Sequence, residues 1–280
     1  MTKKSESINQ SVNESVNESS VMTEFQFDPS LMGEEFNAPR VPRLPYGIVI
    51  NDNPAGLFIP EKNAIKAGWL NLTPELTEIE LAGGEKAKGL FFTSVKMIIL
   101  GNVPPYIRYK NNDDSGDMRG VIVGSYEETR HLLDKKTMEV CSEHLVMFLD
   151  ADNNLLHTRP IRFRFKNVAL WSLRECLEDF YIAMELQFAQ LTHTKASGKT
   201  DRWRALCVLE VQFKGIKEGE GSNKSYCCKI ERFTLPTPEN FHTLFLGAVQ
   251  KSAKIWESYD MNVGAFSLPE SKQFLLEGNE

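Results

Sequence analysis

The sequence has few cysteines, no long apolar segment and a modest excess of acidic over basic residues. Its five cysteines are odd in number and too sparse for a disulfide scaffold, so we expect reduced thiols. No stretch approaches the ~18 consecutive apolar residues of a membrane span. No apolar run follows Lys3 and Lys4, as a secretory signal would require. These absences predict a cytoplasmic protein that does not bind a membrane.

The signatures of common enzyme and metal sites are also missing. The segment 197–200 ends like a phosphate-binding loop, but His193 stands where G-x-x-x-x-G-K-[ST] requires glycine. Cys141 and His144 lack a second ligand pair at zinc spacing. A calcium-binding loop would need glutamate as its twelfth residue, and Gly124 stands at that position. Neither G-x-S-x-G nor H-E-x-x-H occurs. We therefore expect no enzyme activity, no catalytic residue, no cofactor and no metal site.

Acidic residues are concentrated at the two ends of the chain. The formal net charge is -6. Residues 1–40 hold seven acidic and three basic side chains, and residues 257–280 hold five acidic and one basic. Residues 41–256 therefore carry +2, a mild bias that differs from the strongly basic domain of a tight duplex binder.

The segment Arg159–Lys166 has two chemically opposite faces at a period of two, which is typical of a strand. One face is apolar and should point into the core: Ile161, Phe163 and Phe165. The other face is cationic: Arg162, Arg164 and Lys166. A surface strand often carries such cations only to discourage edge pairing. The alternative interpretation is a surface that binds anions.

Further cations and aromatic residues favour the second interpretation. Single-stranded nucleic acid needs cations for its phosphates and aromatic rings for its unstacked bases. The predicted phosphate contacts outside 159–166 are Arg108, Lys110, Lys217, Lys224 and Lys229. The predicted stacking residues are Tyr106, Tyr226 and Trp203. Lys229 cannot share a strand face with Tyr226, because their numbers differ in parity. We expect the cations of 159–166 to lie in line with Arg108 and Lys229.

The order of apolar segments predicts a β-rich α+β fold. Expected strands are 48–50, 57–59, 90–100, 106–110, 119–125, 145–149, 157–166, 203–213 and 226–233. Amphipathic spacing predicts helices over 168–191 and 239–256. This order is similar to an oligonucleotide-binding (OB) barrel, with a helix between the third and fourth strands, plus a C-terminal helix. We expect a disordered tail at 1–23, one globular domain at 24–256 with its OB-like core at about 88–235, and an acidic tail at 257–280.

Short motifs give the chain a family resemblance over roughly residues 40–235. They are Pro42-Arg43-Leu44-Pro45, Ala67-Gly68-Trp69, Gly89-Leu90-Phe91 and Asn223-Lys224-Ser225-Tyr226. With these the chain resembles phage- and plasmid-encoded proteins, some of which are thought to bind single-stranded DNA or assist recombination, and an uncharacterised cyanobacterial family. The resemblance implies a single-stranded DNA-binding role. The chain departs from phage single-strand binders at its end, Gly278-Asn279-Glu280, which lacks their terminal aromatic residue.

Taken together, these features predict a non-enzymatic single-stranded DNA-binding protein of phage-like or mobile-element origin. Its partners would be single-stranded nucleic acid, further copies of itself or other proteins. The alternative is a structural or protein-interaction subunit of a larger assembly, in which the cations meet acidic partner surfaces. A third hypothesis is a nuclease or nucleotide-processing enzyme whose carboxylates cannot be assembled from the sequence.

Overall fold

The structure is a computed structural model that describes residues 28, 44–70, 76–81, 84–219 and 224–262. The chain divides into two compact units, Met1–Val41 and Pro42–Glu280. Every described helix and strand belongs to the second unit. Within the described residues, no helix is both long and apolar enough to cross a membrane.

The second unit is a strand-rich α+β fold. Its strands are β1 (Tyr46–Ile50), β2 (Gly56–Pro60), β3 (Leu76–Glu80), β4 (Lys86–Phe92), β5 (Ser94–Tyr109), β6 (Ile122–Ser125), β7 (Met138–Leu149), β8 (Ile161–Lys166), β9 (Leu209–Glu218) and β10 (Ser225–Phe233). Its helices are α1 (Glu61–Ala67), α2 (Tyr126–Thr129), α3 (Asn167–Thr192), α4 (Asp201–Arg204), α5 (Phe241–Leu244) and α6 (Val249–Asn262). Two short 3₁₀ turns, Asp113–Met118 and Arg130–Leu132, flank β6 and α2.

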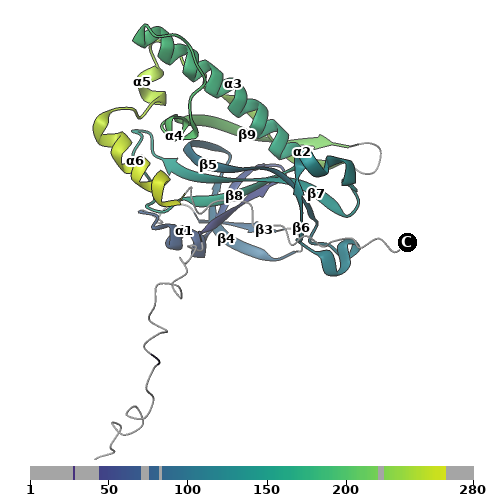
Figure 1. Cartoon of the computed structure of the whole chain (residues 1–280). Helices are drawn as coiled ribbons and strands as arrows, with labels where there is room; N and C mark the ends of the chain where they lie inside the picture. The colour runs from purple at the N-terminus through teal and green to yellow at the C-terminus, as the bar shows by residue number, and fades with distance from the viewer. Residues whose placement is uncertain (1–27, 29–43, 71–75, 82–83, 220–223, 263–280) are drawn as a thin grey trace, which may run out of the picture. The chain divides into compact units, whose positions relative to one another are not determined.

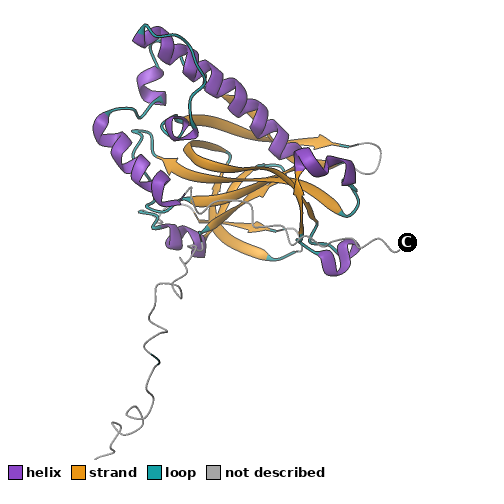
Figure 2. Ribbon diagram, in the orientation of Figure 1, coloured by secondary structure: helices purple, strands orange, loops and turns teal. Residues whose placement is uncertain are grey.

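The strands form one sheet that curls into a half-barrel (Figure 2). Nine strands follow the order β10-β9-β5-β7-β8-β1-β2-β4-β3, and β6 pairs with β5 beside this path. The curl brings the β1–β2 turn against the β9–β10 hairpin, although four strands separate β1 from β10 in the sheet order. The Cys228 backbone N–H donates to Asn51 Oδ1 at 2.8 Å. A Cβ at Gly215 would lie 2.1 Å from the Asp52 carbonyl oxygen.

The concave face of the sheet holds the main hydrophobic core. The long helix α3 packs against β7, β8 and β10 and lies across the sheet (Figure 1). Its side chains Leu173 and Phe180 are buried together with Phe163 and Phe165 of β8. The predicted inward face of β8 and the predicted helix over 168–191 are therefore confirmed.

A second apolar cluster lies on the convex face, near one end of β5 and β7. Ile98 and Leu100 of β5 pack there with Leu145 and Met147 of β7. Ile255 of α6 belongs to the same cluster. Beyond Leu145 the convex face of β7 becomes polar, and the candidate site lies on this polar part.

Several predicted strand boundaries in the middle of the chain are wrong, including those of β6 and β7, which were expected at 119–125 and 145–149. The run 90–100 is divided between β4 and β5, which pair with different strands. The break that was expected between strands 90–100 and 106–110 is absent, because β5 continues through Pro104 and Pro105 to Tyr109. The register of β5 against β7 shifts between Val103 and Tyr106, so the prolines occupy a bulge where the ladder does not require their missing N–H groups.

The C-terminal third also differs from the expected elements. Residues 203–213 do not form one strand, because Trp203 lies on α4 and β9 begins at Leu209. The expected helix over 239–256 is two helices, α5 and α6, and α6 continues to Asn262. The predicted tail at 1–23, most of the tail at 257–280 and the hairpin tip at 220–223 lie outside the described residues.

Candidate nucleic-acid interface

The cations of β8 lie on the convex face of the sheet, beside acidic residues of β7. Strand alternation places Arg162, Arg164 and Lys166 on this face, because Ile161, Phe163 and Phe165 fill the core. β7 pairs with β8 so that Glu143 lies opposite Arg164 and Cys141 lies opposite Lys166. Two carboxylates of β7, Glu139 and Glu143, therefore point between the cations of β5 and β8.

Glu143 is the centre of the first polar cluster. Its Oε1 accepts hydrogen bonds from Arg164 Nε at 2.7 Å and from the Tyr106 hydroxyl at 3.0 Å. Arg164 Nη2 also lies 2.5 Å from this oxygen. Oε2 has a weaker contact, with Arg162 Nη1 at 3.4 Å. Arg164 is thus held firmly, while the Arg162 side chain keeps 42% of its surface exposed.

Glu139 is the centre of the second polar cluster. Its Oε1 lies 3.0 Å from Arg108 Nε and 3.1 Å from Lys166 Nζ. Arg108 is buried, whereas the Lys166 side chain is 41% exposed. The expected alignment of Arg108 with the β8 cations is present through this shared carboxylate. The four cations and two carboxylates of the clusters leave a net charge of +2.

A groove of about 350 Å³ runs between β1 and β8. In the described chain these parallel strands pair at Tyr46–Arg162 and Gly47–Phe163, and then they separate. The groove is lined by the cations of β8 and by the residues Tyr46, Gly47, Ile48, Val49 and Asn51. The separation of the two strands therefore opens the convex face directly beside the cations.

The outward face of β1 adds an apolar row to this groove. Gly47 faces Phe163 in the core, and Val49 packs on the core, so Tyr46, Ile48 and Ile50 point outward by alternation. Tyr46 is 49% exposed. This row was not predicted from the sequence. The alternation of 46–50 was a usable signal, but only the parallel pairing with β8 places it beside the cations.

The β9–β10 hairpin carries the remaining predicted cations. Lys217 lies over the Tyr226 ring, 5.0 Å from its centroid, on the face that also carries buried Cys228. Lys229 lies on the other face, the convex face that also carries the β8 cations, but it pairs with Glu218, and β9, β5 and β7 lie between β10 and β8. Lys224 is exposed at the start of β10. The groove and the hairpin meet at Asn51, which lines the groove and accepts the bond from Cys228.

Besides Arg108 and Lys229, three further predicted contact residues have structural partners instead of an open surface. Tyr106 is 2% exposed and its hydroxyl bonds to Glu143, so a base cannot stack on it without rearrangement. Trp203 packs on Phe188 and Phe245, with ring centroids 5.4 and 5.0 Å away. Lys110 Nζ donates to the carbonyl oxygens of Lys135 and Lys136 at 2.5 and 3.0 Å.

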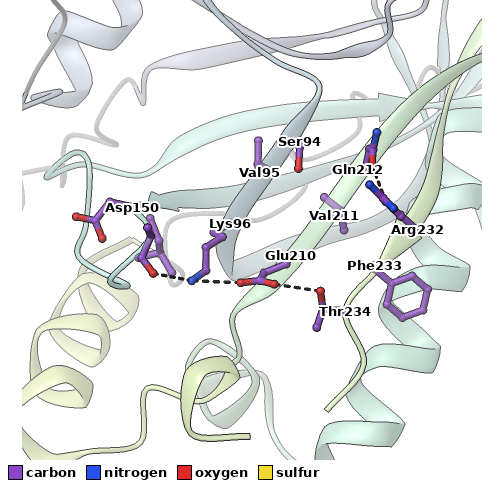
Figure 3. A pocket seen from close by; sticks show the side chains of 12 residues that line it. Ser94, Val95, Lys96, Asp150, Glu210, Val211, Gln212, Arg232, Phe233 and Thr234 are labelled. Carbon is purple, nitrogen blue, oxygen red and sulfur yellow. Dashed lines mark hydrogen bonds and ion pairs between the residues drawn. The ribbon is translucent and has the colours of Figure 1, made fainter. Parts of the chain in front are cut away.

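A second pocket, a concave surface that encloses about 650 Å³, lies where β5, β9 and β10 meet (Figure 3). Three of its charged side chains, Lys96, Glu210 and Arg232, have partners among its own lining residues. Lys96 Nζ contacts Glu210 Oε1 at 3.2 Å and donates to the Ala151 carbonyl oxygen at 3.0 Å. Glu210 Oε2 accepts a bond from Thr234 at 3.0 Å, and Arg232 donates to Gln212 at 2.6 Å. This surface has no row of cations comparable to that of β8.

A family comparison matches residues 41–273 to the model described as a domain of unknown function, DUF5895. The chain belongs to the DUF5895 family. The matched stretch contains every element from β1 to α6 and therefore the whole groove. No curated protein and no solved structure matches this DUF5895 chain.

Burial keeps several thiols and histidines of the DUF5895 domain neutral at pH 7. Burial raises the pKa of the Cys141 and Cys176 thiols to about 12, so both are protonated at neutral pH. Burial lowers the pKa of His144 and His157 to about 4. Among the described residues, no three His, Cys, Asp or Glu side chains are grouped so that they could hold a metal ion.

Proposed function

We propose that this DUF5895 protein is a non-enzymatic, cytoplasmic single-stranded DNA-binding protein that holds its ligand in the groove between β1 and β8. One observation carries the proposal: a partly exposed apolar row, with Tyr46 and Ile48 in the groove and Ile50 next to it, runs beside a cationic row, Arg162, Arg164 and Lys166. Single strands are bound by cations that contact phosphates and by rings or apolar surfaces that contact bases.

The spacing of the two rows supports this arrangement. Alternate residues of a strand recur at about 6.6 Å along its axis, so each row offers a regular series of contacts to an extended chain. The rows run in the same direction, because β1 and β8 are parallel. The cations would neutralise phosphates on one side of the groove. Tyr46 would stack on a base at the other side, which is worth about 1–3 kcal/mol.

We also propose that the half-barrel binds its ligand in the way that an OB barrel does. α3 lies between β8 and β9 in the chain, as a helix lies between the third and fourth strands of an OB barrel. The β9–β10 hairpin would act as the loop that extends the binding path. The Asn51–Cys228 bond supports this role, since it joins the end of the groove to β10, two residues from Tyr226.

Fluorescence anisotropy with labelled oligo-dT at several salt concentrations tests the proposal. Wild-type protein should bind at low salt, and the logarithm of affinity should fall by about 0.7 per phosphate contact for each tenfold rise in salt. The double variant Arg162→Gln, Arg164→Gln should bind at least tenfold more weakly and show a shallower slope. Because the double variant leaves the Tyr106 hydroxyl as the partner of the nearly buried Glu143 carboxylate, its stability is measured by urea unfolding alongside binding.

The matched control is Lys62→Gln, Lys66→Gln on α1, which removes two exposed cations away from the groove. It should bind as the wild type does, apart from a small general charge effect. Absence of oligo-dT binding at low salt, or equal losses in the two double variants, would contradict the proposal.

A further inference from the structure

The arginines at the groove are already paired with an internal carboxylate. Glu143 side-chain oxygens contact Arg162, Arg164 and the Tyr106 hydroxyl, and 9% of the Glu143 side chain is exposed. A carboxylate held by arginine nitrogens presents the same kind of acceptor oxygens as a phosphate. Any phosphate that binds these arginines must therefore compete with Glu143.

The two oxygens of Glu143 are unequally held. Oε1 accepts from Tyr106 and Arg164 at 3.0 and 2.7 Å, and its partners are part of the packed sheet. Oε2 contacts Arg162 at 3.4 Å, which is long for a charge-assisted hydrogen bond. Arg162 is also the most exposed cation of the cluster. It can leave Glu143 without disturbing the Tyr106 and Arg164 bonds.

We infer that Glu143 is a positioning residue that acts as an internal competitor of phosphate and holds the groove in a weakly binding state. On ligand binding, Arg162 exchanges Glu143 Oε2 for a phosphate oxygen of the single strand, while Arg164 stays on Oε1 and orients the second contact. This inference rests on the proposed function. It adds that affinity is limited by a residue that does not touch the ligand.

The test is the binding of oligo-dT by the variant Glu143→Gln. Its amide oxygen can still accept from Tyr106 and Arg164, but the negative charge that holds Arg162 is gone. Affinity at low salt should increase roughly three- to tenfold, because Arg162 no longer has to leave a carboxylate. The salt slope should stay close to that of the wild type, since Arg162 contacts one phosphate in both proteins. The control, Glu210→Gln, removes the same charge next to Lys96 on the other concave surface. It should leave the affinity close to that of the wild type.

The opposite change comes from Tyr106→Phe, which keeps the buried ring and removes one donor to Glu143. The carboxylate then depends more on its arginines, so oligo-dT should bind about twofold more weakly. If Glu143→Gln does not fold, Tyr106→Phe tests the competitor role of Glu143 in its place.

The outcomes separate the two proposals. If the wild type binds oligo-dT through Arg162 and Arg164, but Glu143→Gln binds no more tightly than Glu210→Gln, the competitor role is wrong and the binding function holds. If Glu143→Gln is unfolded and Tyr106→Phe binds as well as the wild type, the competitor role is equally wrong. If neither the wild type nor Glu143→Gln binds at low salt, the binding function itself fails.

Discussion

Single side chains of this protein differ in function mainly through their partners. Arg108 and Arg162 carry the same charge on neighbouring parts of one sheet face. Arg108 is buried and pairs with Glu139 inside the sheet. Arg162 has one long contact, with Glu143, and its side chain is 42% exposed. The sequence shows both as cations in alternating strands. Their burial depends on which strand lies beside them, and composition and spacing do not contain that information.

His157 shows how burial makes a side chain sensitive to pH. Its Nε2 accepts the Phe148 backbone N–H at 2.8 Å, and its Nδ1–H donates to the Arg159 carbonyl oxygen at 2.8 Å. Trp69 stacks on the ring at a centroid distance of 5.1 Å. Protonation of Nε2 would remove the acceptor for Phe148 and place a charge in the core, so burial lowers the pKa to about 4.

We predict that the unfolding free energy falls as pH drops from 6.5 towards 4. The folded-state pKa of His157 and His144 lies below the usual value of about 6.5, so the unfolded chain binds these protons first. The loss should be about 2 kcal/mol per histidine by pH 5, where most carboxylates are still ionised. Urea unfolding at pH 7, 6 and 5 measures it.

The variant His144→Gln provides the control for this pH effect. It should reduce the pH-dependent loss by about half, because His157 remains. A free energy of unfolding that stays constant from pH 7 to pH 5 would show that the two histidines are not held neutral by burial.

At the scale of elements, alternation was a reliable guide where a strand separates core from surface. The inward face of β8 was predicted correctly, because its alternate apolar side chains are stable only when a core buries them: Ile161, Phe163 and Phe165. α3 was predicted from its 3.6-residue spacing for the same reason. Pro104-Pro105 misled the prediction, since a bulge in β5 removes the need for the N–H groups that proline lacks.

The contact between β1 and β8 depends on a glycine. A Cβ at Gly47 would lie 2.1 Å from Cε1 of Phe163, a ring that is fully buried. We predict that Gly47→Ala destabilises the protein by about 1–3 kcal/mol through overpacking, and that it weakens oligo-dT binding by displacing β1 from β8. Urea unfolding and anisotropy measure the two effects.

Gly198→Ala is the matched control, because nothing lies within 4 Å of a Cβ at that position. It should leave both stability and binding close to those of the wild type. If Gly47→Ala were as stable as Gly198→Ala, the close approach of β1 to Phe163 would be contradicted.

For the whole molecule, the sequence predicted the class of fold better than the pairing of its strands. A β-rich sheet with one long helix follows from local periodicity. The curl follows from contacts between distant segments, such as Gly215 with the Asp52 backbone and Asn51 with Cys228. The N-terminal strands β1 to β3 also join the sheet, although the core was expected to begin near residue 88. No local pattern indicates that β1 pairs with β8.

The same limit applies to the candidate site. The cations of β8 were recognisable from their spacing, but Glu139 and Glu143 lie outside the strand that was expected at 145–149, and β7 begins earlier, at Met138. Their role follows from the register of β7 between β5 and β8, which alternation alone does not set. The apolar row of β1 was missed for this reason too, while Tyr106 and Trp203 were chosen for their rings and not for their surroundings.

The central claim is that a base lies on Tyr46 while phosphates lie on the β8 cations. Ultraviolet crosslinking of the wild-type protein to oligo-dT, followed by mass spectrometry of its peptides, tests this most directly. We predict a nucleotide adduct on the peptide that contains Tyr46, which disappears as salt rises. Adducts confined to peptides outside β1, such as those that contain Trp203 or the outer face of α3, would contradict the claim.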